Sequence, residues 1–281
     1  MKQGKRHLIQ ALATLLSNPH IPNFFTGSIY QGSTKRICVP GLNCYSCPGA
    51  AGACPIGSLQ AVIGGRTKNV SYYVFGVLLL FGVLFGRLIC GFLCPFGFVQ
   101  DLLHKIRTPK PTIPRRLDQT LRWGKYAALA AVLILPAVLT DAFGIGDPVF
   151  CKYICPAGTL QGGIPLLLSN ESLRSAAGFL FSWKMGILVL VLVGSVLLYR
   201  PFCKYLCPLG AFYGLLNRFS AYQMRVDEHA CVHCGKCEKA CKMGVNVVQN
   251  INSAECIRCG LCKEVCPTHA IVSGFGKSKK N

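Results

Sequence analysis

The sequence predicts a mainly α-helical fold, in which three to four polytopic membrane helices form two pseudo-repeated halves and precede a small α+β domain. Three observations predict it. Of the 281 residues, 52% are apolar and only 14% are charged, a balance typical of membrane proteins. A cysteine motif recurs at the ends of apolar segments. Residues 222–275 are more polar and carry eight of the eighteen cysteines.

Four apolar segments are candidates to cross a bilayer, which takes about 20 residues of helix, so flanking residues must extend the shorter ones. Residues 7–34 contain no Lys, Arg, Asp or Glu. Asn18, Pro19 and Pro22 interrupt this first segment, which therefore predicts a helix that either spans the membrane or re-enters it. The other three segments are Val70–Gly86, Tyr126–Thr140 and Met185–Tyr199.

Basic residues predict the orientation of these segments. The loop 101–125 contains seven Lys or Arg residues against two Asp residues, whereas the loop 144–176 is balanced. Because basic loops stay on the cytoplasmic side, we expect a multi-pass protein of the cytoplasmic (inner) membrane with both termini inside. The net charge of +20 is thus assigned to membrane flanks and not to nucleic-acid binding. Four basic residues of the first outer loop weaken the orientation without reversing it: Lys35, Arg36, Arg66 and Lys68.

A Cys-x3-Cys-Pro-x-Gly motif occurs three times, and its second half occurs a fourth time. Two cysteines four residues apart lie on one face of a helix, which the following proline must end or kink. Each pair therefore supplies half of a four-cysteine metal site. Six residues after the second cysteine, three copies have a glutamine and the last copy has Tyr213. The copies begin at Cys90, Cys151 and Cys203, the half copy begins at Cys54, and the glutamines are Gln60, Gln100 and Gln161.

The expected topology sorts these cysteines into two sets, each predicted to hold one [4Fe-4S] cluster. The cytoplasmic set is Cys90, Cys94, Cys203 and Cys207. The outer set contains Cys54, Cys151 and Cys155 and needs a fourth thiolate. Cys47 is chosen because a proline follows it, with Cys44 in reserve and Cys38 left over. A bilayer core about 30 Å thick separates the faces, so the motifs must fold inward, or another carrier must bridge them, if the sets are to communicate.

Other uses of the membrane cysteines stay open. They could be inert buried thiols or sites of palmitoylation. Disulfide bonds are disfavoured, because the spacings are of the metal-binding kind. Haem is disfavoured too, because His20 and His104 are isolated histidines near the expected interfaces.

The C-terminal region shows the spacing of a bacterial ferredoxin with two [4Fe-4S] clusters. Two runs of Cys-x2-Cys-x2-Cys-x3-Cys follow each other, and in this pattern the fourth cysteine of each run binds the other cluster. Zinc is the rival, but four cysteines in each run at this spacing favour iron-sulfur. The expected ligands are Cys231, Cys234, Cys237 and Cys266 for one cluster, and Cys256, Cys259, Cys262 and Cys241 for the other. The expected domains are 1–221 in the membrane, 222–275 as the ferredoxin domain and 276–281 as a basic tail.

The three Cys-x3-Cys-Pro motifs, followed by this tail, resemble the membrane-bound polyferredoxin family, which includes NapH-like and NosR-like proteins. The resemblance covers roughly residues 70–275. It implies a bacterial membrane protein that moves electrons between a cytoplasmic donor, or the quinone pool, and a membrane or extracytoplasmic oxidoreductase. The cysteine-rich stretch from Cys38 to Cys54 and the motif at Cys151 are not expected in the simpler members.

We therefore expect an iron-sulfur electron-transfer protein whose partners are the membrane, redox proteins and, as an open alternative, a quinone. Whether it is itself an enzyme stays open. If it oxidises a quinol, it is a quinol dehydrogenase. The alternative is a redox-sensing protein or an assembly factor for another metalloprotein. Electron donor, acceptor and direction do not follow from the residues.

Overall fold

The computed structural model describes residues 3–65, 72–111, 113–142 and 144–276. Arg66, Lys68 and the start of the expected segment at Val70 lie outside the described residues, as does nearly all of the basic tail 276–281. The described chain is almost entirely helical. Its one sheet, in the described part, is a two-stranded ribbon near the C-terminus.

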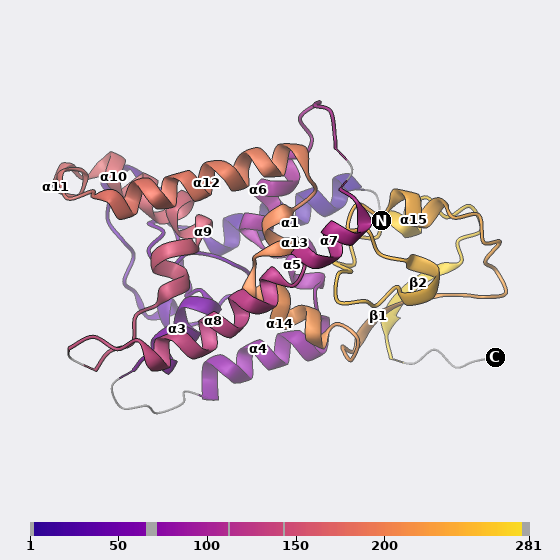
Figure 1. Ribbon diagram of the computed structural model, residues 1–281, viewed down its shortest axis with the longest axis horizontal. Coiled ribbons are helices and arrows are strands. Elements are labelled where there is room, and N and C mark those ends of the chain that lie inside the picture. Colours follow the sequence, from indigo (N-terminus) through magenta and orange to yellow (C-terminus); the bar gives the residue numbers. More distant parts are fainter. Residues whose placement is uncertain (1–2, 66–71, 112, 143, 277–281) are drawn as a thin grey trace.

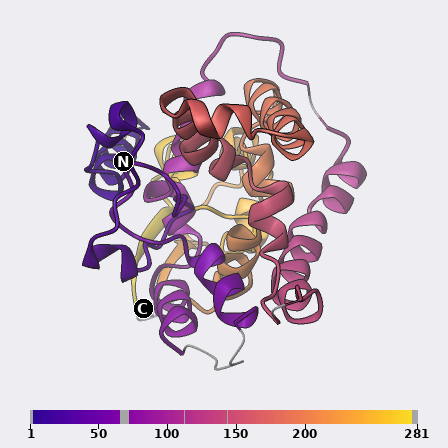
Figure 2. The ribbon, with the colours of Figure 1, turned by 90° about the vertical axis from the view of Figure 1, so that its left-hand side faces the viewer.

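Four long helical segments run back and forth along the long axis of the molecule (Figure 1). They are α1 (Gln3–Ser17), α4 (Tyr72–Phe85), α8 (Gly124–Val138), which continues from α7 (Arg115–Leu121), and α12 (Phe179–Leu197). Viewed from the end far from the C-terminal region, these segments surround the shorter helices (Figure 2). Two helices in the described residues are long and apolar enough to cross a membrane, Arg115–Val138 and Phe179–Leu197, and Tyr72–Phe85 is a shorter apolar helix.

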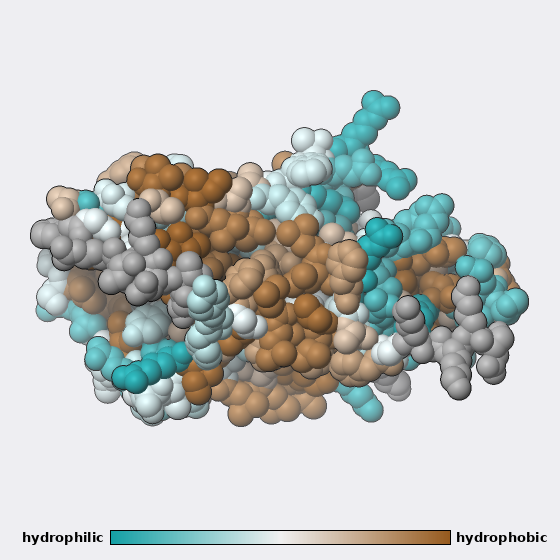
Figure 3. Space-filling model, turned by 90° about the horizontal axis from the view of Figure 1, so that it is seen from below, coloured by the Kyte–Doolittle hydropathy of each residue, from teal (hydrophilic) through white to brown (hydrophobic). Residues whose placement is uncertain are grey.

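Large apolar side chains cover the outside of these segments. Leu80 on α4, Ile134 on α8 and Leu190 on α12 are all more than half exposed. On the underside of the molecule, a broad hydrophobic band covers the middle and gives way to polar atoms toward the C-terminal region (Figure 3). The helix α1 has the same character, because Leu8, Leu12 and Leu16 point outward while Arg6 and Gln10 are buried.

The cysteine motifs break the helices as the prolines predict. In the motif at Cys90, helix α5 (Leu88–Phe92) carries the first cysteine, and Cys94 caps α6 (Pro95–Leu103), whose first residue is the proline. The other copies repeat this arrangement with α13 (Pro201–Tyr205) and α14 (Pro208–Leu216), with η2 (Phe150–Ile154) and α9 (Pro156–Gly158), and with α3 (Pro55–Ile63) for the half copy. The remaining short elements of this part are α2 (Asn23–Thr26), η1 (Ser33–Arg36), η3 (Thr159–Gly163), α10 (Ile164–Ser169) and α11 (Glu171–Ser175).

The C-terminal region is a small α+β unit. Strands β1 (Tyr222–Val226) and β2 (Ile271–Phe275) pair antiparallel, with Tyr222 opposite Phe275 and Val226 opposite Ile271. Between them lie α15 (Lys236–Ala240), α16 (Val247–Asn250) and α17 (Leu261–Glu264). Its own core is small: Met224, Val247, Ile251, Cys262 and Ile271.

A single larger core joins the two parts of the chain. It contains cysteines of all the membrane motifs, and Ile257 of the C-terminal region is buried in it. Cys241, Cys256 and Cys259 pack against the same core. The C-terminal region is therefore docked on the helical part by buried contacts.

Candidate metal centres

All eighteen cysteines are free thiols. The structure brings twelve of them together in three sets of four, and the ferredoxin spacing predicts a fourth set in the C-terminal region. We name the sets by their place along the molecule. The distal site is Cys44, Cys54, Cys151 and Cys155, and the central site is Cys90, Cys94, Cys203 and Cys207. The docked site is Cys241, Cys256, Cys259 and Cys262, and the exposed site is Cys231, Cys234, Cys237 and Cys266.

The central site is assembled by two motifs related by reciprocal contacts. Arg87 and Arg200 each stand three residues before the first cysteine of a motif. Arg87 Nη2 donates to the carbonyl oxygen of Cys203 at 3.0 Å, and Arg200 Nη1 donates to that of Cys90. The four cysteines are only 3 to 6% exposed. Burial raises the pKa of Cys207, and the charges of Cys203, Cys90 and Cys94 raise it further.

Hydrogen-bond donors point at the sulfur atoms of this site. The amide nitrogens of Gly97 and Gly210 donate to Cys94 Sγ at 3.4 Å and to Cys207 Sγ at 3.3 Å. Gln100 Nε2 donates across to Cys203 Sγ of the other motif at 3.1 Å. Donors of this kind stabilise the negative charge of thiolate ligands and tune the potential of a bound cluster. The glycine of Cys-Pro-x-Gly and the glutamine of the repeat thus donate hydrogen bonds to the cysteine sulfur atoms.

The distal site repeats this chemistry. Gln60 Nε2 donates to Cys151 Sγ at 3.1 Å, and the Gly158 amide donates to Cys155 Sγ at 3.4 Å. The glycines leave the space between the thiols free: a β-carbon at Gly57 would lie 3.8 Å from Cys151 Sγ, and one at Gly158 would lie 3.7 Å from Cys44 Sγ. All four cysteines line one cavity of about 920 Å³.

The structure brings Cys44 to this cavity and places Cys47 elsewhere. The Cys44 amide donates to Gln161 Oε1 at 2.8 Å, which ties the cysteine to the third glutamine of the repeat. Cys47 Sγ donates instead to Asn18 Oδ1 at 3.4 Å and does not line the cavity. Spacing alone favoured Cys47 because of the following proline, and no local signal in the sequence reveals the contact between Cys44 and Gln161.

The docked site unites the two cysteine runs. Burial raises the pKa of Cys256 to about 12, with the charges of Cys259 and Cys241 adding to the effect. The four thiols line a cavity of about 250 Å³, and so do Arg6, Asp101 and Tyr199 of the helical part. The cysteine that ends the first run, Cys241, therefore stands with the second run, in the arrangement that the ferredoxin spacing predicts.

The exposed site lies away from the helical part. Cys234 is exposed to solvent, and Cys237 and Cys266 pack against the small core of the C-terminal region. Burial raises the pKa of Cys237, and the charges of Glu238 and Cys231 contribute. A second cavity, beside Cys231, is lined by residues of the C-terminal region alone.

Two features of the thiol surroundings suit an iron-sulfur cluster. A cavity lies among the thiols of the docked site, and amide donors point at sulfur in the central site. Within the described residues, no group of three Cys, His, Asp or Glu side chains is arranged to hold a single metal ion.

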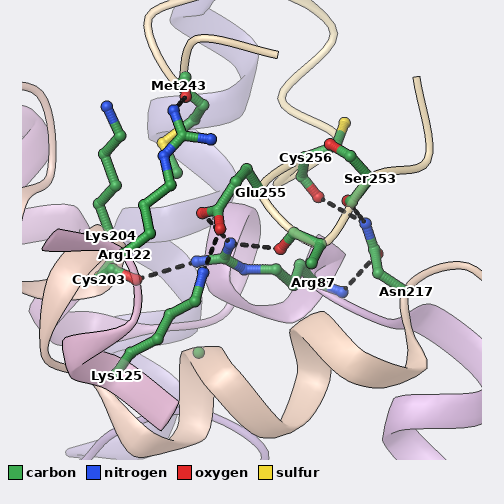
Figure 4. A network of polar contacts seen from close by, with 12 residues as sticks. Arg87, Arg122, Lys125, Cys203, Lys204, Asn217, Met243, Ser253, Glu255 and Cys256 are labelled. Carbon is green, nitrogen blue, oxygen red and sulfur yellow. Dashed lines mark hydrogen bonds and ion pairs between the residues drawn. The ribbon is translucent and has the colours of Figure 1, made fainter. Parts of the chain in front are cut away.

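A buried ionic network connects the central and docked sites (Figure 4). Arg87 Nη1 donates to the carbonyl oxygen of Ala254 at 2.6 Å and to Glu255 Oε2 at 3.0 Å. Glu255 also pairs with Lys125 of α8. Burial alone would raise the pKa of Glu255, but the charges of Arg87 and Lys125 outweigh it and lower the pKa, so the carboxylate is charged. The residue after Glu255 is Cys256 of the docked site.

Two features connect the central and distal sites. Tyr213, fully buried, donates to the carbonyl oxygen of Pro40 at 3.0 Å, and the charges of Cys90, Cys94 and Cys54 all act on it. The backbone of Leu42 lies close enough to the Cys94 thiol to act against the rise in its pKa that burial causes, and Cys44 follows two residues later. That chain length holds the thiols of Cys94 and Cys44 within roughly 15 Å, half the thickness of a bilayer core. The central and distal cysteines are thus closer together than the two faces of a bilayer would be.

The histidines meet aromatic rings or the surface, although His104 also lines the cavity of the docked site and His233 the cavity beside Cys231. The His20 ring stacks on Tyr30 with centroids 3.8 Å apart, and the His104 ring meets Tyr199 edge to face at 5.3 Å. His229, His233 and His269 are exposed on the C-terminal region.

Comparison with known proteins identifies iron-sulfur regions along most of the chain. A family described as "4Fe-4S binding domain" matches three segments of the helical part, and two further families with the same description match the C-terminal region. The matched residues are 70–114, 127–170 and 180–223 for the first family, and 223–246 and 250–272 for the other two.

Several relatives have names that refer to ferredoxins or electron transport. The methylamine utilization ferredoxin-type protein MauN of Paracoccus denitrificans is 30% identical over 64% of this chain and 54% of its own. The putative electron transport protein YccM of Escherichia coli is 27% identical over 76% of this chain and 58% of its own. An uncharacterized protein of Methanocaldococcus jannaschii is 29% identical over 64% of this chain and 68% of its own.

The resemblance to NosR-like proteins is confirmed. The regulatory protein NosR of Stutzerimonas stutzeri is 25% identical over 57% of this chain, although the match covers only 21% of NosR. The chain spans between about half and two thirds of the length of MauN, YccM and the archaeal protein. No solved structure matches the chain.

Proposed function

Because this chain belongs to the ferredoxin-type 4Fe-4S electron-transport proteins, we propose that it carries electrons through a membrane along four cysteine-held clusters. The observation that carries the proposal is the order of the elements that carry the cysteines: α15 lies at one end of the molecule, α5 and α13 in the middle, and α3 and α9 toward the other end (Figure 1). A [4Fe-4S] cluster accepts and releases one electron at a time. With one cluster in each site, the chain would contain about sixteen irons.

The residues between the sites would supply a short and dry path. Arg87 touches both the central and the docked site, and Tyr213 lies between the central and the distal site. Electron tunnelling falls exponentially with distance, so the approach of the central and distal cysteines removes the need for a jump across the whole bilayer. Burial of the central cysteines keeps water from this part of the path.

A membrane location is the second part of the proposal. The outward apolar side chains of α4, α8 and α12 form a surface that a soluble protein rarely exposes, and the two long apolar helices match the length of a bilayer span. The alternating direction of α1, α4, α8 and α12 supports four crossings of a cytoplasmic membrane. The C-terminal region would then lie in the cytoplasm and the distal site near the outer face.

Reporter fusions check this orientation. A reporter fused after Asn281 is expected to be active only on the cytoplasmic side, and one fused near Asn170, in the charge-balanced loop, only on the outer side. The assay compares alkaline phosphatase with green fluorescent protein at both positions. An outward C-terminus would contradict both the topology and the assignment of the distal site to the outer face.

The two ends of the series would meet the redox partners. At the exposed site, Cys234 reaches the surface, which suits contact with a soluble electron-carrying protein. At the distal site, the open cleft is lined by Lys35, Lys184 and Tyr45, and it would admit a quinone head group or a protein partner. Relatives named as ferredoxin-type proteins support redox partners of this class.

Interrupting the series tests the function. In sealed vesicles with the C-terminal region outside, a reduced soluble ferredoxin is expected to reduce the distal cluster of the wild-type protein, as followed by rapid-freeze electron paramagnetic resonance (EPR). The variant Cys203→Ser is expected to lose about four irons, retain the distal cluster and leave it oxidised. Equal reduction of the distal cluster in both proteins would show that electrons do not pass through the central site.

A further inference from the structure

We propose that Gly91 is a positioning residue that sets the separation between the central and docked sites, an inference that rests on the proposed electron path. Gly91 follows Cys90 of the central site, and Ile257 follows Cys256 of the docked site. A β-carbon at Gly91 would lie 2.4 Å from the carbonyl oxygen of Ile257, closer than any such contact that real side chains make. Only glycine allows these two backbones to touch.

The contact joins rigid partners on both sides. Ile257 is 1% exposed and belongs to the core shared by the two parts of the chain. Gly91 lies within α5, between Cys90 and the end of that short helix. Because the clash at Gly91 would involve a backbone oxygen, no rotation of a side chain can relieve it. A methyl group at this position must move either α5 or the loop 253–258.

The same loop is fitted against two further glycines of the helical part. A β-carbon at Gly214 would lie 3.1 Å from the carbonyl oxygen of Ala254. Gly86 has a φ of +53° and faces the Arg258 guanidinium. Arg258 Nη1 and Nη2 donate to the carbonyl oxygens of Phe85 at 2.8 Å and Asn217 at 2.7 Å. The loop therefore has little freedom to shift sideways. A methyl group at Gly91 must instead push the loop 253–258 and α5 apart.

Separation acts directly on the electron path. Gly91 and Ile257 are each next in sequence to a cysteine of the site on their own side, so pushing their backbones apart moves Cys90 and Cys256 apart. Tunnelling falls exponentially with distance, and the magnetic interaction between two reduced clusters falls with its cube. Both quantities should respond to a shift that leaves every cysteine bound to its own cluster.

The experiment compares three glycine variants of the full-length protein. Gly91→Ala is expected to keep the wild-type iron content, weaken the EPR splitting between the docked and central clusters and slow electron transfer between them several-fold. Hydrogen exchange of amides 253–258 should become faster, which is a readout independent of the clusters. Gly214→Ala should show the same changes at smaller size. Gly76→Ala, on an exposed face of α4 with no atom within 4 Å of the added carbon, should behave as wild type.

The outcomes separate this inference from the proposed function. Wild-type splitting and exchange in both Gly91→Ala and Gly214→Ala would overturn the positioning role while leaving the electron path intact. A wild-type protein without central and docked clusters would overturn the proposed function itself. If Gly91→Ala fails to assemble, the milder Gly214→Ala still decides between these results.

Discussion

Cys44→Ser is expected to remove about four of sixteen irons, whereas Cys47→Ser leaves the iron content unchanged. Cys44 lines the distal cavity, and its amide is held by Gln161, while the Cys47 thiol is turned toward Asn18. A cluster that loses one thiolate in an open cleft has only water to replace it. The measurements are iron content and the EPR spectrum of the reduced protein, where the distal signal alone should disappear.

Cys38→Ser is the matched control for this pair, because Cys38 is buried in the same cysteine-rich stretch and does not line the cavity. It should resemble Cys47→Ser. Iron loss in Cys47→Ser with normal iron in Cys44→Ser would restore the choice made from spacing. Equal losses in all three variants would instead indicate a general role of this stretch in folding.

Much of this architecture could be predicted from local patterns. The four-residue spacing of the cysteines and the proline after the second one require two short helices with a break, which is what α5 and α6 form. The pairing of the motif at Cys90 with that at Cys203 followed from charge and topology, and the structure brings these cysteines together. In the C-terminal region, spacing alone placed Cys241 with the second run.

The contacts between sites could not be predicted, because they depend on residues far apart in sequence. Nothing near Arg87 in the chain reveals that it reaches Cys203 and Glu255, which lie 116 and 168 positions away. The position of Tyr213 between the central and distal sites could not be predicted either. The sequence shows only that a tyrosine replaces the glutamine of the other copies. The approach of the stretch around Leu42 to Cys94 leaves no periodic signal in the sequence at all.

Buried charge explains how so basic a chain fixes its geometry. The chain has only ten acidic residues against thirty Lys and Arg, and two of those acids occupy buried positions beside the central site. Asp101 pairs with Arg6 and Arg200, and Glu255 pairs with Arg87 and Lys125. Each acid thus anchors one of the two arginines that cross between the motifs. Asp101 anchors α1 to the site, and Glu255 anchors the C-terminal region.

Glu255→Ala should therefore loosen the docking of the C-terminal region, at a cost of about 3–5 kcal/mol, because it leaves Arg87 and Lys125 buried without their partner. Measurements are thermal unfolding, cleavage by a protease in the connection near Ala221, and the EPR splitting between the docked and central clusters. Unfolding should begin at a lower temperature, cleavage should be faster and the splitting should be weaker. The docked and exposed clusters should still be bound.

Glu238→Gln is the matched control, because Glu238 is an exposed acid of the same region and should have little effect. A double variant, Arg87→Met with Glu255→Ala, separates the pair from its surroundings: it should be less destabilised than the sum of the single changes, since it removes one of the two stranded cations. Glu255→Ala could instead match Glu238→Gln in melting temperature, in protease resistance and in the coupling between clusters. In that case the ionic network does not hold the two parts together. The apolar burial of Ile257 would then have to account for the docking by itself.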